Sequence, residues 1–193
     1  MTLKHNEIVA VTTWAASAAP LAGLYFRSVE YRHMDPKDVL SGAGTQANGG
    51  RFASVGTKAV YLSATDSGAS KEVTARKARL GGAAQITVAK YPRVVYVVSV
   101  NLQRVLDLTT VPTSAVLKAL RKKCLSANEL VPSMELAAHL QKAGVQGLVF
   151  PSVVAGGDDN LIVYLANCKA GSLKLENEAE LIAQAKLIAS RTR

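Results

Sequence analysis

A glycine-rich stretch with one arginine is the part of this sequence best suited to bind an anion. It spans residues 41–52 and reads SGAGTQANGGRF. Glycines let a backbone approach a ligand closely, and successive N–H groups can form an anion-binding concavity beside the guanidinium of Arg51. The stretch matches neither GxGxxG nor GxxxxGK[ST], the established phosphate-loop patterns. Taken alone, it fits an ordinary surface loop better than a phosphate site.

Four other residues could take part in the same chemistry. Arg27 ends a predicted strand before the glycine-rich stretch, Tyr61 lies on a predicted strand after it, Glu72 follows on a predicted helix, and Ser152 follows a later strand. Each also has an ordinary explanation, such as an exposed helix pair between Glu72 and Arg76, strand packing for the tyrosine, or a turn for the serine. Their order along the chain therefore carries more information than any one of them.

Segments of strand and helix character must position these residues. The predicted elements are an N-terminal helix within 1–20, strands at 24–29, 59–63, 94–100, 147–150 and 161–165, helices at 113–123, 133–143 and 176–190, and a helix capped by Asp66 or Ser67. Residues 35–57 are poor in apolar side chains and predict a long functional loop. Strands and helices mix without strict βαβ alternation, which favours an α+β domain over a Rossmann sheet.

Length and composition are typical of one enzyme-sized domain. The 193 residues predict a single domain over 1–193 with a core at about 23–167, on which the terminal helices pack. A net charge of +9 favours an anionic partner, whereas only 5% aromatic residues count against a stacking platform for single-stranded nucleic acid. Cys124 and Cys168 lie far apart without metal-ligand spacing, so we expect a reducing cytoplasm, no disulfide framework and no metal.

The first 26 residues contain a run of small and apolar side chains. Thr12, Thr13 and Ser17 interrupt it before the roughly twenty apolar residues that a membrane span requires, and few basic residues precede it. We expect a buried N-terminal helix and no membrane association. Export as a secreted effector is the alternative.

The order of the candidate residues resembles that of the RES family, which is named for its Arg, Glu and Ser. Members of this family are NAD-consuming toxins of bacterial RES–Xre toxin–antitoxin pairs. The resemblance covers about 23–167, and the matching pieces are residues 25–27, 41–44, 49–52 with Gly56, 60–63, Glu72, 102–108, 147–152 and 160–161. No single piece is diagnostic, but this many pieces in the right order make coincidence a poor explanation.

The resemblance implies a role for each candidate residue. Arg27, Glu72 and Ser152 correspond to the named triad, and Arg51, Tyr61, Gly49 and Gly50 line the ligand pocket. The arginines would hold the pyrophosphate, Tyr61 would stack on the nicotinamide, and Glu72 would bind the ribose and stabilise developing positive charge. Ser152 would bind a ligand oxygen or amide rather than act as a nucleophile, since no His stands near it in the sequence. Arg32 is the alternative first arginine, and Ala53 stands where the family usually has Asn.

The resemblance also implies a fold, an activity and a partner. The fold would be the split β-core of ADP-ribosyltransferases, with a cleft between two small sheets. NAD would be the substrate, cleaved between nicotinamide and ribose, with water, inorganic phosphate or a protein accepting ADP-ribose. An Xre-type antitoxin would restrain the enzyme, and nucleic acid would be contacted only through that antitoxin. A non-catalytic nucleotide- or RNA-binding module using the same basic cleft is the alternative.

Overall fold

The computed structural model describes residues 3–70, 93–126, 130–152 and 158–183. Glu72 and the later part of its predicted helix lie outside the described residues, as do residues 184–190 of the predicted C-terminal helix. Within the described ranges, no helix is long and apolar enough to cross a membrane.

Six strands form the centre of the domain. They are β1 (Ala19–Glu30), β2 (Ala59–Ser63), β3 (Arg93–Asp107), β4 (Gly147–Pro151), β5 (Asp159–Tyr164) and β6 (Leu173–Leu175). Most of them are rich in Val, Leu, Ile and Tyr, residues that suit a half-buried pleated surface. The predicted strands at 24–29 and 94–100 are the middle portions of the much longer β1 and β3.

The sheet divides into two groups of three strands. The strand order is β1-β2-β5-β4-β3-β6, and a further pairing of β1 with β3 closes the first five strands into a ring. β1, β3 and β6 form one antiparallel group, and β2, β5 and β4 form the other. The groups meet at the pair Phe26↔Ser63 and along a short parallel ladder between β3 and β4. The α+β class and the split β-core predicted from the sequence are therefore confirmed.

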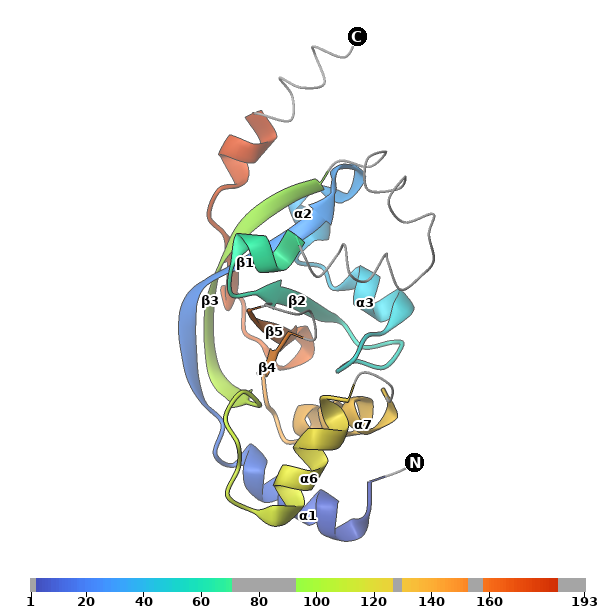
Figure 1. Ribbon diagram of the computed structural model, residues 1–193. Coiled ribbons are helices and arrows are strands. Elements are labelled where there is room, and N and C mark those ends of the chain that lie inside the picture. The colour runs from blue at the N-terminus through green and yellow to red at the C-terminus, as the bar shows by residue number, and fades with distance from the viewer. Residues whose placement is uncertain (1–2, 71–92, 127–129, 153–157, 184–193) are drawn as a thin grey trace.

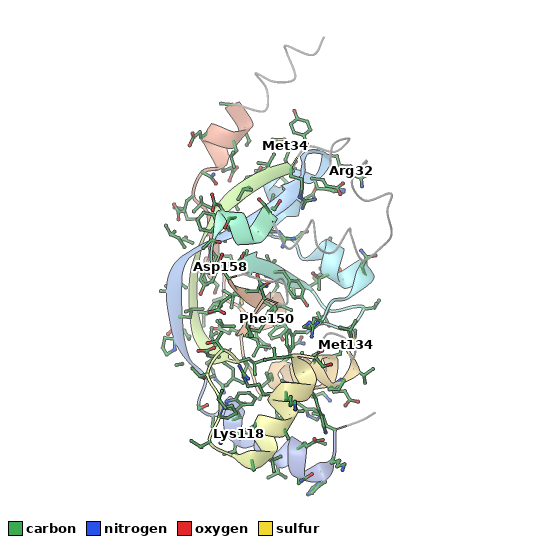
Figure 2. The ribbon with its side chains drawn as sticks, in the orientation of Figure 1. Arg32, Met34, Lys118, Met134, Phe150 and Asp158 are labelled. Carbon is green, nitrogen blue, oxygen red and sulfur yellow. The ribbon has the colours of Figure 1, made fainter. Side chains whose placement is uncertain are left out.

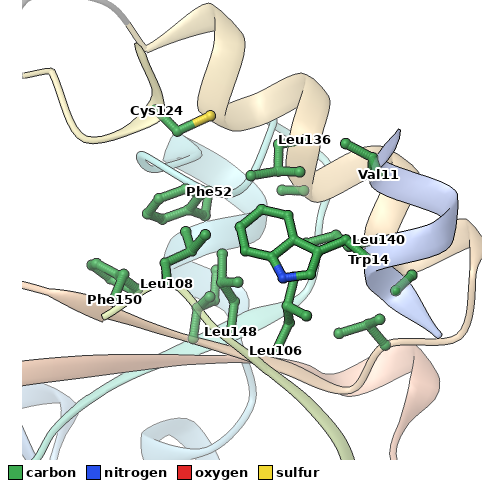
Figure 3. Packing of buried hydrophobic residues seen from close by; sticks show 14 of the residues in the cluster. Val11, Trp14, Phe52, Leu106, Leu108, Cys124, Leu136, Leu140, Leu148 and Phe150 are labelled. Atoms are coloured by element: carbon green, nitrogen blue, oxygen red, sulfur yellow. The ribbon is translucent and has the colours of Figure 1, made fainter. Parts of the chain in front are cut away.

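Three helices pack together at one end of this core (Figure 1). They are α1 (His5–Ala15), α6 (Ala115–Cys124) and α7 (Val131–Lys142). Trp14 lies among Leu106, Leu136 and Leu140 beneath them (Figure 3). This is the largest apolar cluster described, and it also takes in Phe52 and Phe150, which ties the glycine-rich segment to the helices.

The predicted loop at 35–57 is wrong in part, because two short helices lie within it. α2 (Pro36–Val39) begins at Asp35, whose side chain accepts a hydrogen bond from Lys37 N, and α3 (Ala43–Asn48) follows. Gly42 and Gly49 flank α3 with φ of 69° and 65°, left-handed values that favour glycine. Gly42 and Gly49, both buried, therefore mark the start and the end of this helix.

Candidate functional site

The guanidinium of Arg27, on β1, is only partly hydrogen-bonded. Its Nη1 donates to the backbone oxygen of Tyr61 at 2.8 Å, while its Nε is buried and has no hydrogen-bond partner within the described part of the chain. Burial, and to a smaller extent the neighbouring charge of Arg93, lower the Arg27 pKa to about 10. Among the described residues, no carboxylate contributes to that shift. A buried guanidinium of this kind is stabilised by any anion that reaches it.

The strand register assembles one face of the sheet around β2. Phe150, Asn160, Ser63 and Phe26 stand opposite one another in a row that crosses β4, β5, β2 and β1. Because side chains alternate along a strand, Tyr61 and Ser63 lie on the same face. Ser63 Oγ is a second buried polar atom without a partner in the described residues.

Tyr61 is fixed at both ends of its side chain. Its hydroxyl accepts a hydrogen bond from Phe52 N at 3.0 Å, and its ring meets the ring of Phe150 edge-on at a centroid distance of 6.3 Å. A Cβ at Gly50 would lie 2.5 Å from the Tyr61 hydroxyl, so glycine is required at that position. The Gly-Gly-Arg segment is therefore docked directly on Tyr61.

Arg51 lies on the tight turn that Gly50 begins. Gly50 N donates to Ala53 O at 2.8 Å, and the fully buried Ala53 returns a longer bond of 3.4 Å. Arg51 Nη1 donates to Cys124 O at 3.1 Å and Ser126 O at 2.7 Å, at the C-terminal end of α6. A cation is favourable there because helix carbonyls carry partial negative charge. Sequence reasoning missed this anchor, since nothing in the sequence links residues 51 and 124.

The other candidate residues differ in position. Ser152 is half-buried and lies one residue beyond β4, whereas Glu72 lies outside the described residues. Arg32 Nε donates to Glu30 at 2.9 Å, and 64% of the Arg32 side chain is exposed. Arg32 lies at the upper end of the molecule in Figure 2, while Phe150 and Asp158 lie near its middle. Within the described residues, Tyr61 contacts Arg27 through its backbone oxygen and the Gly50–Ala53 turn through its hydroxyl.

The start of the helix that leads toward Glu72 was also mispredicted. Helical structure begins at residue 66, and Thr65, not Asp66 or Ser67, caps it. Thr65 Oγ1 accepts from Gly68 N at 3.0 Å and donates to the carboxylate of Asp158, next to β5. Asp158 was not singled out from the sequence, although it directly follows the glycines at 156–157.

Two surface hollows lie elsewhere on the described molecule. One is lined by residues of β6 and of the helical segment at 178–183, and the other by Leu40, Leu165 and residues 168–173. None of the candidate site residues that the structure describes lines either hollow. No cluster of three or more metal-ligating side chains is found within the described ranges.

Comparisons with known proteins agree on one family and one fold. The model of the RES domain matches residues 25–180. The fold is similar to a chain in the crystal structure of the M. tuberculosis MbcT–MbcA toxin–antitoxin complex, with a TM-score of 0.73 and 19% sequence identity over 90% of each chain. At this identity the likeness concerns the fold. Among curated proteins, none matches the sequence.

Proposed function

Because this chain belongs to the RES domain family, we propose that it is the toxin of a toxin–antitoxin pair and that it cleaves NAD between nicotinamide and ribose. The match to the RES domain supports an activity on NAD, as the family resemblance implies. The fold shared with a chain of a toxin–antitoxin complex supports the toxin role.

The observation that carries this proposal is the state of Arg27. A desolvated guanidinium whose Nε has no partner and no compensating carboxylate among the described residues is suited to a dianionic ligand such as a pyrophosphate. The ligand restores the interactions that burial removed, and it raises the Arg27 pKa toward its ordinary value. Arg32, exposed and paired with Glu30, has no such need, so we assign the first arginine of the family to Arg27.

The glycine turn and Tyr61 form the second part of the proposed site. Gly50 lets the turn pack against Tyr61 and Gly49 lets it close on Ala53, and Arg51, anchored on α6, joins Arg27 in holding the pyrophosphate. Tyr61, held by Phe52 and Phe150, presents a fixed ring on which the nicotinamide stacks. A fixed ring loses little conformational freedom when the ligand binds.

Bond cleavage needs one further group. When the glycosidic bond breaks, its electron pair leaves with neutral nicotinamide, and the ribose carries positive charge until an acceptor adds. Glu72 stabilises that charge and binds the ribose hydroxyls, and Ser152 orients the ligand by hydrogen bonding. Water, inorganic phosphate or a protein side chain then completes the reaction.

Product analysis tests the proposal. Purified protein is incubated with NAD, with and without phosphate, and the products are identified by mass. Free nicotinamide with ADP-ribose indicates hydrolysis, nicotinamide with a phosphorylated ADP-ribose indicates phosphorolysis, and added mass on a protein indicates transfer. If calorimetry shows that NAD binds but no product forms, the proposed enzyme activity is contradicted and a nucleotide-binding module is favoured.

A toxin that consumes NAD in the cytoplasm must be restrained by the cell that makes it. The net charge of +9 suits an antitoxin with an acidic or mixed surface, which we expect to be of the Xre type. Co-expression with the product of a neighbouring small gene tests this partner. A stable complex that blocks NAD cleavage supports it, and full activity in the presence of that product contradicts it.

A further inference from the structure

Asp158 joins two segments that are far apart in the sequence. Its carboxylate accepts the hydrogen bond from Thr65 Oγ1, and Thr65 in turn caps the helix that begins at residue 66. The same junction is held by the backbone, because Ala64 N donates to Asp159 O at 2.9 Å. The start of the helix is therefore bonded to the residues that enter β5.

The absence of a side chain at Gly68 allows the first turn of the helix to lie close to Asp158 and to the end of β2. A Cβ at Gly68 would lie 3.2 Å from Asp158 Oδ2 and 3.1 Å from Thr65 Oγ1, and it would overlap the buried hydroxyl of Ser63. The first turn of the helix thus rests on the end of β2 with no side chain between them. Ala69, which follows, is buried.

Asp158 also lies at the end of the β4–β5 ladder where β4 leads into Ser152. In the β4–β5 ladder the last pair is Pro151↔Asp159, so the next residues outward are Ser152 and Asp158. Glu72 follows the described first turn of the helix, 66–70, by two residues along the chain. Asp158 therefore stands where the segment ending in Ser152 meets the segment leading to Glu72.

We propose that Asp158 is a positioning residue for the NAD-cleaving site. Through Thr65 it holds the helical turn at 66–70, which precedes Glu72 in the sequence, against the Ser152 end of the β4–β5 ladder, so that the two segments keep a fixed spacing. This inference rests on the proposed function, and it assigns Asp158 no contact with NAD. A side chain of this kind affects the rate of the bound complex more than it affects substrate affinity.

Steady-state kinetics of nicotinamide release test the positioning role. Asp158→Ala and Thr65→Val each lower kcat by at least about tenfold with little change in KM, which is the size expected when a catalytic group is misplaced. Thr65→Ser keeps the hydroxyl and stays within about twofold of the wild type. The double variant is no slower than the worse single variant, because both changes remove one interaction.

Asp159→Asn is the matched control, because it removes the neighbouring charge and leaves the Thr65 contact in place. It retains wild-type kcat. Retained kcat in both Asp158→Ala and Thr65→Val, or a loss confined to KM, would overturn the proposal. Melting curves confirm that each variant is folded at the assay temperature.

Hydrogen exchange tests the anchor without reference to activity. The amides of Gly68 and Ala69 exchange at least about tenfold faster in Asp158→Ala than in the wild type or in Asp159→Asn, because the capped turn opens more often. Unchanged exchange in Asp158→Ala overturns the proposal even if the enzyme is active. A wild type that exchanges as described but releases no nicotinamide contradicts the proposed function alone.

Discussion

Two arginines that donate to backbone carbonyls differ in how fully the protein satisfies their guanidinium groups. At the helical end, Arg104 donates from Nη1 to Ala143 O at 2.7 Å and from Nη2 to Ala15 O at 3.0 Å, which joins the C-terminal ends of α7 and α1. At the junction of the two strand groups, Arg27 donates once to Tyr61 O, and its buried Nε has no partner in the described chain. The first guanidinium joins two helix ends, while the second has a donor without a partner in the described chain, which we propose is used by the ligand.

The difference shows that a hydrogen bond from an arginine to a backbone carbonyl does not by itself indicate the role of that arginine. Carbonyls at helix ends compensate Arg104 with backbone that is always present. Arg27 lies beside Arg93 instead, so its pKa is lowered first by burial and then by a like charge. Arg51 combines both features, because it lies on the glycine turn of the site and is anchored on the end of α6.

Replacing Arg27 should have the largest effect on NAD cleavage. We expect Arg27→Ala to lower kcat/KM for NAD cleavage about 100-fold, equivalent to about 2.7 kcal/mol, because a charged contact to the ligand is lost. Its Tm should stay within about 4 °C of the wild type, since relief of a desolvated charge offsets the lost bond to Tyr61. Arg32→Ala removes the same charge at the surface and should keep full activity. An equal loss in Arg32→Ala would make Arg32 the family's first arginine.

Replacing Arg104 should lower stability and leave catalysis unchanged, the opposite of what we expect for Arg27. Arg104→Ala removes two bonds to helix-end carbonyls and should cost about 2 kcal/mol after discounting for its partial exposure. For a chain of this size the Tm should fall by about 4–8 °C, with unchanged kcat/KM for the folded protein. Lys118→Ala, an exposed change on α6, should alter neither. A loss of catalysis without a fall in Tm would show that Arg104 belongs to the site.

Glu72 is the residue that we propose acts in the catalytic step itself, beside the ligand contacts of Arg27. Glu72→Ala should lower turnover of NAD by at least about tenfold and leave the fold intact, as expected when one transition-state contact is lost. Nicotinamide release and circular dichroism measure the two properties. Glu178→Ala is an exposed control of the same residue type and should be fully active. Unchanged turnover in Glu72→Ala would remove that residue from the mechanism.

The smallest effect should be on the pH dependence of stability, through one ion pair between the helices α1 and α6. Lys123 Nζ lies 2.7 Å from Glu7 Oε1, and this hydrogen bond is the largest cause of the lowered Glu7 pKa. Because the folded pKa lies below the ordinary value of 4.5, the stabilisation is present above pH 4.5 and is lost as the pH falls through the folded pKa. Melting curves of Glu7→Gln should therefore depend less on pH in this acid range, by less than about 1 kcal/mol. Identical slopes for the two proteins would contradict the assignment.

Residue patterns in the sequence predicted where strands and helices occur better than they predicted where those strands and helices end. The valine-rich segment at 94–100 was recognisable, but β3 continues to Asp107 because its later residues pair with β4, a contact distant in sequence. The short helix α3 was hidden among glycines, since its start and end depend on the left-handed φ of Gly42 and Gly49. β6 is only three residues long and exists through its pairing with β3, so no periodicity could reveal it.

Residue types predicted candidate members of the site, but not how the protein holds them. The order of Arg27, the glycine-rich stretch, Tyr61 and Glu72 suggested the family and, through it, an anion site; in the structure Tyr61 contacts both Arg27 and the glycine turn. The anchor of Arg51 on α6 and the capping of the helix by Thr65 and Asp158 depend on contacts across 73 and 93 residues. Such contacts are set by tertiary packing, which a single sequence does not display.

Calorimetry with ADP-ribose tests the central claim most directly, because this molecule carries the pyrophosphate and lacks the nicotinamide. The account predicts that ADP-ribose binds the wild type and Arg104→Ala with equal affinity, and binds Arg27→Ala at least about tenfold more weakly. Equal affinity for the wild type and Arg27→Ala would contradict it, because the buried guanidinium would then hold no part of the ligand.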